Sequence, residues 1–242
     1  MKKHLSCFML PARSTIYKML LLIAAMAAVE ITVFYFVLRA NPQDSLETLL
    51  VKSYVHLIFS VTFLLLMALF CATGSEYGGS RVRYTIARLS VSERVLVLWW
   101  ALYYTLAILI FWAAQTLIAV ALCRIYERLA AGALVGGQTV FLTFYRYNFF
   151  HSLLPLAEWG RYVRNVLLAL SLGVGCACFS FRRRRDQSGV AAVVLAALTV
   201  LSFPAHMGAT ELDVIIPLLS LVVAGSALIG VWGFKENENE EA

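Results

Sequence analysis

Long apolar runs, separated by short polar segments, fill most of the 242-residue chain. A run of about 20 apolar residues is long enough to cross a bilayer as an α-helix. The pattern therefore predicts an all-α protein, a single transmembrane domain of six membrane-spanning helices with both termini in the cytosol. The predicted spans are residues 16–38, 51–73, 95–123, 162–181, 190–207 and 214–234.

The basic residues between these runs indicate which side each loop faces. They concentrate in the N-terminal segment, in residues 74–94 and in the block Arg182–Arg185. Lys and Arg accumulate on the cytosolic side of membrane proteins. Six crossings put all three segments on that side, so the six-span arrangement satisfies the rule.

Residues 124–161 break the simple pattern, because they are rich in aromatic side chains but also carry charged ones. As a seventh span they would place Arg146 near the middle of the bilayer, where a charge is costly. They would also move the block Arg182–Arg185 to the outer side. We therefore expect residues 124–161 to lie on the outer side, either as a re-entrant segment or along the membrane surface.

Composition supports an integral membrane protein. The chain is 61% hydrophobic and only 14% charged, whereas a soluble domain has about 25% charged residues. The net charge of +6 comes from short basic blocks that suit contact with lipid headgroups, so membrane lipid is an expected partner and nucleic acid is not. The five cysteines include no Cys-x-x-Cys pair, which argues against a disulfide framework or a zinc site.

Two polar residues inside the predicted spans are candidates for a transport pathway, Glu30 in the first span and Gln115 in the third. A carboxylate within a bilayer must face protein or water, or be protonated. Glu30 could therefore line a polar pathway or form an interhelical contact. The alternative is a position near the outer interface, paired with Arg39 or Lys52. For Gln115 we expect an interhelical hydrogen bond.

The third span opens with a group of aromatic residues, Trp99, Trp100, Tyr103 and Tyr104. Trp and Tyr are enriched where membranes meet water, so these residues are interpreted as a belt at the inner interface. The span has about 29 residues, more than a bilayer needs. We expect this helix to begin before the hydrocarbon core and to join residues 74–94 rigidly.

Proline and small residues predict the local geometry of two other segments. Pro11 is expected to separate a surface-lying N-terminal piece, which includes Phe8, from the first span. In the fourth span Gly173, Gly175 and Ala177 predict close contact with a neighbouring helix, because small residues let two backbones approach.

Residues 74–94 are the longest polar interruption in the first half of the chain. Glycines end the preceding span, and Ser90 and Glu93 fit a capping box for the next helix. Between them we expect a short basic amphipathic helix, which would dock in a partner's groove or lie on the membrane; an ordinary solvated loop is the alternative. Its apolar face is Val82, Ile86 and Leu89, with Arg81, Arg83 and Arg88 off that face.

The layout of six spans with a cytosolic loop before the third resembles the permeases of type-2 ATP-binding-cassette (ABC) exporters. The loop carries the resemblance over about 20 residues. The residues that correspond to the family's loop are Glu76, Tyr77, Gly78, Tyr84, Thr85, Arg88, Leu89, Ser90, Ser92 and Glu93.

The resemblance implies a mechanism and a set of partners. A separate cytosolic ATPase dimer would bind ATP and Mg, with no cofactor in this chain, and a second permease half would complete the transporter in a bacterial cell membrane. The residues expected to couple to the ATPase are Glu76, Tyr77, Gly78, Arg81, Arg83, Tyr84, Arg88, Leu89, Ser92 and Glu93. The chain departs from the family in one respect, since residues 208–213 form only a short turn where many members have an outer hairpin.

Motifs for catalysis are missing from the sequence. It has no HExxH, no GxSxG and no Walker A phosphate loop, so we expect no enzyme activity in this chain. Two alternatives to a permease stay open. One is a membrane scaffold or regulatory protein, and the other is a small intramembrane enzyme with a polar cluster around Glu30, His56 and His206.

Overall fold

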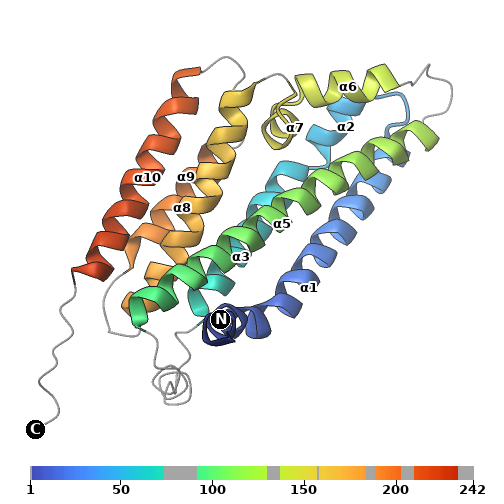
Figure 1. Cartoon of the computed structure of the whole chain (residues 1–242). Helices are drawn as coiled ribbons and strands as arrows, with labels where there is room; N and C mark the ends of the chain where they lie inside the picture. The colour runs from blue at the N-terminus through green and yellow to red at the C-terminus, as the bar shows by residue number, and fades with distance from the viewer. Residues whose placement is uncertain are drawn as a thin grey trace, which may run out of the picture.

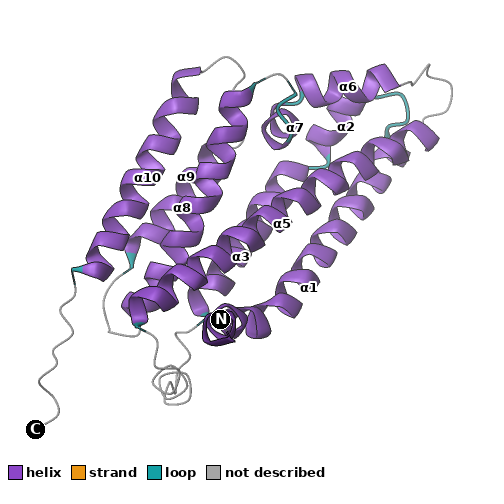
Figure 2. Cartoon of the chain, in the orientation of Figure 1, coloured by secondary structure: helices purple, strands orange, loops and turns teal. Residues whose placement is uncertain are grey.

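A computed structural model describes residues 2–73, 92–129, 137–156, 158–183, 189–202 and 210–233. Within these ranges every element is an α-helix, and no strand is present (Figure 2). The all-α prediction is therefore confirmed. The helices are α1 (Lys2–Ala40), α2 (Leu46–Lys52), α3 (Val55–Ala72), α5 (Glu93–Leu129), α6 (Gly137–Arg146), α7 (Asn148–Leu153), α8 (Trp159–Arg183), α9 (Val190–Ser202) and α10 (Thr210–Trp232).

Five of these helices are long and apolar enough to cross a membrane, so the chain is a multi-pass membrane protein. The candidate spans are Ser6–Ala40, Val55–Ala72, Glu93–Leu129, Trp159–Arg183 and Asp213–Trp232. Helix α9 is apolar but has only 13 residues, about 20 Å of helix against a hydrocarbon core of about 30 Å. Its predicted continuation to residue 207 lies outside the described residues.

The long helices form two groups that meet along α5 and α8 (Figure 1). Helices α1, α3 and α5 lie on one side, and α8, α9 and α10 on the other. The N-terminus of α1 lies at the same end as the end of α3, the start of α5 and the ends of α8 and α10; we call this the N-terminal end. Helices α2, α6 and α7 gather at the opposite end, which we call the α6 end.

Close packing of α8 depends on two of the predicted small residues. A Cβ added to Gly173 would lie 2.2 Å from the Thr105 hydroxyl and 2.8 Å from the Ala101 carbonyl oxygen of α5. A Cβ added to Gly175 would lie 2.9 Å from Leu195 of α9. The prediction of small residues at a helix contact is thus confirmed for both glycines.

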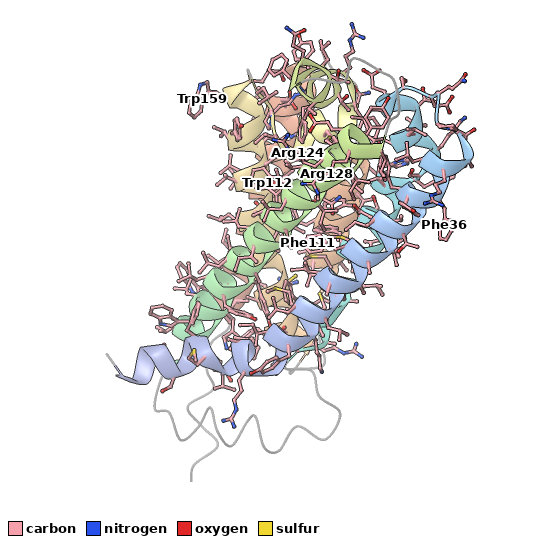
Figure 3. All side chains as sticks on the ribbon, turned by 90° about the vertical axis from the view of Figure 1, so that its right-hand side faces the viewer. Phe36, Phe111, Trp112, Arg124, Arg128 and Trp159 are labelled. Atoms are coloured by element: carbon pink, nitrogen blue, oxygen red, sulfur yellow. The ribbon has the colours of Figure 1, made fainter. Side chains whose placement is uncertain are left out.

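Pro11 lies inside α1 and does not end it, so the predicted break of the helix at Pro11 is wrong. The first part of α1 instead runs at a steep angle to the rest of the same helix (Figure 3). Proline lacks the N–H that would bond to the preceding turn, which accounts for a bend without a break. The hydroxyls of Ser14 and Thr15 donate to the Pro11 carbonyl at 2.9 and 2.8 Å.

The predicted second span, residues 51–73, is divided between two helices. Helix α2 begins after Ser45, whose hydroxyl accepts from the Thr48 N–H at 3.4 Å. It ends at Lys52, with Ser53 as its C-cap, and Tyr54 then adopts a left-handed backbone, with φ 51° and ψ 33°. The chain turns at Tyr54 and continues as α3, so the spanning helix begins at Val55 rather than Val51.

The segment that follows α5 contains two short helices with different surroundings. Helix α6 has 10 residues and lies across the α6 end, with Thr143 and Phe144 as its buried side chains (Figure 1). Helix α7 has 6 residues, of which the last five are buried. The segment therefore combines a surface-lying helix with a helical turn inserted among the long helices.

Candidate functional site

The predicted coupling residues lie mostly outside the described part of the chain, which stops at Thr73 and resumes at Ser92. Ser92 and Glu93 are described, at the start of α5. The Ser92 carbonyl accepts from the Val95 and Leu96 N–H groups at 3.1 and 3.2 Å. The others remain predictions and are Glu76, Tyr77, Gly78, Arg81, Arg83, Tyr84, Arg88 and Leu89.

The two ends of the described chain that flank residues 74–91 are fixed to the helix bundle. Thr73 closes α3, with its N–H and hydroxyl both bound to the Leu69 carbonyl. The Ser180 hydroxyl of α8 donates to the Thr73 carbonyl at 2.9 Å. Glu93 then lies in the first turn of α5, where a carboxylate favours the positive end of the helix dipole.

The aromatic residues at the start of α5 do not form a lipid-facing belt, so that interpretation is wrong for most of them. Trp100, Tyr103 and Tyr104 are buried. Tyr104 stacks on Phe70 of α3 with ring centroids 4.8 Å apart. Residues spaced by three and four positions share one face of a helix, and here that face meets the other helices. Trp99 is only partly buried.

The bent N-terminal part of α1 docks on this same region of α5. Phe8 contacts Trp99 and Tyr103 edge to face, at centroid distances of 6.3 and 5.6 Å. The hydroxyls of Thr15 and Tyr103 share a hydrogen bond of 2.7 Å. The beginning of the chain is thereby tied to the helix that starts at the predicted coupling segment.

Glu30 and Gln115 meet between α1 and α5, both with no exposed surface. The amide Nε2 of Gln115 donates to the two carboxylate oxygens of Glu30, at 3.1 and 3.0 Å. This is the interhelical contact expected for Gln115, and it is one of the alternatives left open for Glu30. The alternative pairing of Glu30 with Arg39 or Lys52 is wrong, because Lys52 binds Asp44 at 2.6 Å and Arg39 lies 5.0 Å above a tyrosine ring.

Helix α7 packs close to this pair. Phe149 lies 5.1 Å from Phe59 of α3, which stacks on Phe111 of α5 at 5.4 Å. The indole of Trp112 donates to the Leu153 carbonyl at 3.0 Å (Figure 3 labels both α5 aromatics). Burial raises the pKa of the Tyr147 phenol, and the nearby carboxylate of Glu30 raises it further.

A second buried polar cluster lies at the α6 end, and sequence reasoning did not identify it. Arg161 and Arg164, both on α8, are 3% and 2% exposed. Arg164 binds Asp213 of α10 at 2.6 Å, and Arg161 binds Asp213 at 3.3 Å. Arg161 also pairs with Glu158, which lies 3.7 Å from the buried His151 of α7. The cluster holds α7, α8 and α10 together.

The only sequence signal for this cluster is charge at the ends of two adjacent spans. Arg161 and Arg164 open α8, and Asp213 lies at the start of α10. Opposite charges at span ends on the same side predict a possible ion pair, but give no means of choosing partners. Within the described ranges, no three His, Cys, Asp or Glu side chains lie close enough together to hold a metal ion.

Comparisons with protein-family models, with curated proteins and with solved structures found no match for this chain. The resemblance to ABC exporter permeases therefore remains a prediction from the topology and the loop.

Proposed function

We propose that this chain is the membrane-spanning permease subunit of an ABC exporter, driven by a separate cytosolic ATPase that binds ATP and Mg. In this proposal the N-terminal end of the bundle faces the cytosol and the α6 end faces outward. Helix α9 with its continuation supplies the sixth span. A second permease half, identical or not, completes the pathway in a bacterial cell membrane.

The orientation is supported by the ends of the long helices. The start of α1, the end of α3, the start of α5 and the end of α8 share the N-terminal end (Figure 1). The basic segment 74–94 and the block Arg182–Arg185 connect to these same helix ends. A cytosolic location of that end satisfies the positive-inside rule.

One observation carries the proposal, the continuity of α5. It is a single helix of 37 residues, about 55 Å long, with no glycine or proline in its sequence. It begins where the predicted coupling segment ends and contacts α1, α7 and α8 along its length. A push at its N-terminal end would therefore reach the buried Glu30–Gln115 contact and the α6 end without a hinge.

The test is recruitment of an ATPase by the full chain. We expect the tagged protein, purified from its native membranes in a mild detergent, to carry a nucleotide-binding subunit and to hydrolyse ATP. The double variant Arg83→Glu, Arg88→Glu should reduce the bound ATPase roughly tenfold or more, because it reverses two charges at the expected contact. Bound subunits are identified by mass spectrometry, and hydrolysis is measured as phosphate release.

The matched control is Arg183→Glu, a charge reversal at an exposed position in the last turn of α8 at the same end of the bundle. It should leave ATPase recruitment unchanged. Purification of the intact chain without any nucleotide-hydrolysing subunit would overturn the proposal. Equal recruitment by the double variant and the parent would overturn the assignment of the contact.

A further inference from the structure

The environment of Glu30 is unusual for a carboxylate. It lies in the span Ser6–Ala40 with no exposed surface. Its hydrogen-bond partner is a neutral amide, Gln115. No ion pair joins it to any described residue. A buried carboxylate without a cation is stabilised by taking up a proton, since the neutral acid loses far less hydration than the anion.

Gln115 can satisfy Glu30 in either protonation state. As placed, its Nε2 donates to both carboxylate oxygens, which suits the anion. Its Oε1 is buried and has no hydrogen-bond partner among the described residues. Turning the amide by half a turn exchanges N and O, and Oε1 would then accept from the O–H of a neutral Glu30. The Gln115 side chain can therefore hydrogen-bond to both the carboxylic acid and the carboxylate of Glu30.

Tyr147 supplies a second neutral group beside the pair. Its side chain is partly buried, its hydroxyl oxygen is buried without a hydrogen-bond partner in the described part of the chain, and its pKa is raised by burial and further by the carboxylate of Glu30. A phenol can donate to a carboxylate or accept from a carboxylic acid. Two unused polar atoms, Gln115 Oε1 and the Tyr147 hydroxyl, therefore lie near one buried carboxyl group.

The charged groups on the helices around Glu30 are distant along those helices or bound elsewhere. On α1, Arg39 is nine residues away, about 14 Å along the helix, and lies over Tyr35. On α5, Arg124 is nine residues beyond Gln115 and binds Glu127 at 2.8 Å. The remaining titratable residues on the neighbouring α2, α3, α5 and α7 are Glu47, Lys52, His56, Cys71, Glu93, Arg94, Tyr103, Tyr104, Cys123, Tyr126, Arg128 and His151. Of these, Lys52 is paired with Asp44.

We propose that Glu30 is a proton-binding site inside the membrane domain, in which Gln115 can hydrogen-bond both to the carboxylate and to the carboxylic acid. Proton uptake converts the carboxylate to a carboxylic acid with no other change in bonding. The site links α1 to α5, so gain or loss of this proton changes the contact between the two helices. The inference needs the membrane location of Glu30 and does not depend on an ATPase partner.

Infrared spectroscopy of the full chain in lipid vesicles tests the proposal. As the pH is lowered, the carbonyl band of a buried protonated carboxyl group should appear before the bands of the exposed carboxyl groups, which protonate only at lower pH. Glu30→Gln, which conserves shape and volume, should abolish this band. Gln115→Leu should retain the band but move it to higher frequency, because the acid loses a hydrogen-bond partner. The control Glu127→Gln alters a carboxylate that is paired with Arg124 and should leave the band unchanged.

Labelling provides a second readout that needs no variant to fold. A hydrophobic carbodiimide reacts with protonated carboxyl groups within the bilayer, so the wild-type peptide that contains Glu30 should gain the adduct mass. Acid should increase the yield, and alkali should suppress it. No adduct at Glu30 under acid conditions, or a carbonyl band that persists in Glu30→Gln, would overturn the proposal. The first result would mean that Glu30 stays ionised, and the second that another carboxyl group binds the proton.

Discussion

Arg164 and Asp213 show how a single pair of charges can hold the end of a membrane bundle. Their side chains are 2% and 12% exposed and bind at 2.6 Å. Removing one member of a buried ion pair leaves the other charge desolvated and unpaired. The residues are 49 positions apart, so the sequence alone could supply the charges but not the pairing.

Asp213→Ala should lower the free energy of unfolding by about 3–5 kcal/mol, because the buried Arg164 loses its partner. The matched control is Asp44→Ala, which breaks the more exposed pair with Lys52 and should cost at most about 1 kcal/mol. Thermal unfolding in detergent measures both. Equal effects of the two substitutions would contradict a structural role for the Arg164 pair.

Gly173 is a residue where one methyl group should matter. Gly173→Ala would place a carbon 2.2 Å from the Thr105 hydroxyl and 2.7 Å from the Thr105 nitrogen. We expect a loss of about 1–3 kcal/mol in unfolding free energy, because α5 and α8 must move apart. Gly225→Ala in α10 is the control, since nothing lies within 4 Å of the added carbon; it should be neutral or slightly stabilising. Unfolding by heat or denaturant measures the stability of both variants and distinguishes Gly173→Ala from Gly225→Ala.

At the scale of the element, apolar length predicted the five long apolar helices, but not where the chain bends. The sequence gives no glycine or proline at Tyr54, so the break between α2 and α3 could not be predicted there. The Pro11 signal was present but misread, because a bend and a break have the same signature. Likewise, the residue types of Trp100 and Tyr104 favour a position at the membrane–water interface. Only their spacing along α5 indicates that they are buried against other helices.

The candidate site was predictable to a similar extent. Glu30 and Gln115 were identifiable because polar residues are rare within apolar runs. Their contact across 85 residues depends on the relative height of α1 and α5, which no local pattern fixes. Tyr147 could not be singled out from the sequence, because it lies in an aromatic-rich segment whose position relative to the long helices cannot be predicted from composition.

Helix α7 provides a test at this scale. Phe149 packs on Phe59 and is 3% exposed, so Phe149→Ala should cost about 3–5 kcal/mol. It should also speed hydrogen exchange of the α7 amides, because the helix loses its packing partner. Phe141→Ala in α6 removes the same side chain at a position that is 56% exposed. If both variants leave α7 equally protected, the insertion of α7 among the long helices is contradicted.

The whole molecule has two unlike ends. At the N-terminal end the bent start of α1 packs on α5, and the described helix ends that flank the basic segments lie there as well. The α6 end carries three short helices and the buried charge cluster (Figure 1). These differences are those expected of a protein whose two faces meet different aqueous compartments.

Orientation can be measured in a chain whose five native cysteines are replaced. Gln43→Cys adds an exposed thiol between α1 and α2, and Arg183→Cys adds one at the end of α8. A membrane-impermeant maleimide should label the first in intact cells, and the second only after the cells are opened. The reverse pattern would place the basic loops outside and would contradict the proposed topology.

Tyr54 carries a consequence for how the molecule sits in its lipid. A left-handed backbone costs a residue with a side chain roughly 1–2 kcal/mol, whereas glycine adopts it freely. The chain nevertheless keeps a phenol at this turn, 62% exposed near the α6 end. Tyr side chains are enriched at membrane interfaces, where the amphipathic ring lies at the level of the headgroups. Tyr54→Gly should therefore raise the unfolding temperature of the protein. It should also leave the depth of the protein in the bilayer less well defined.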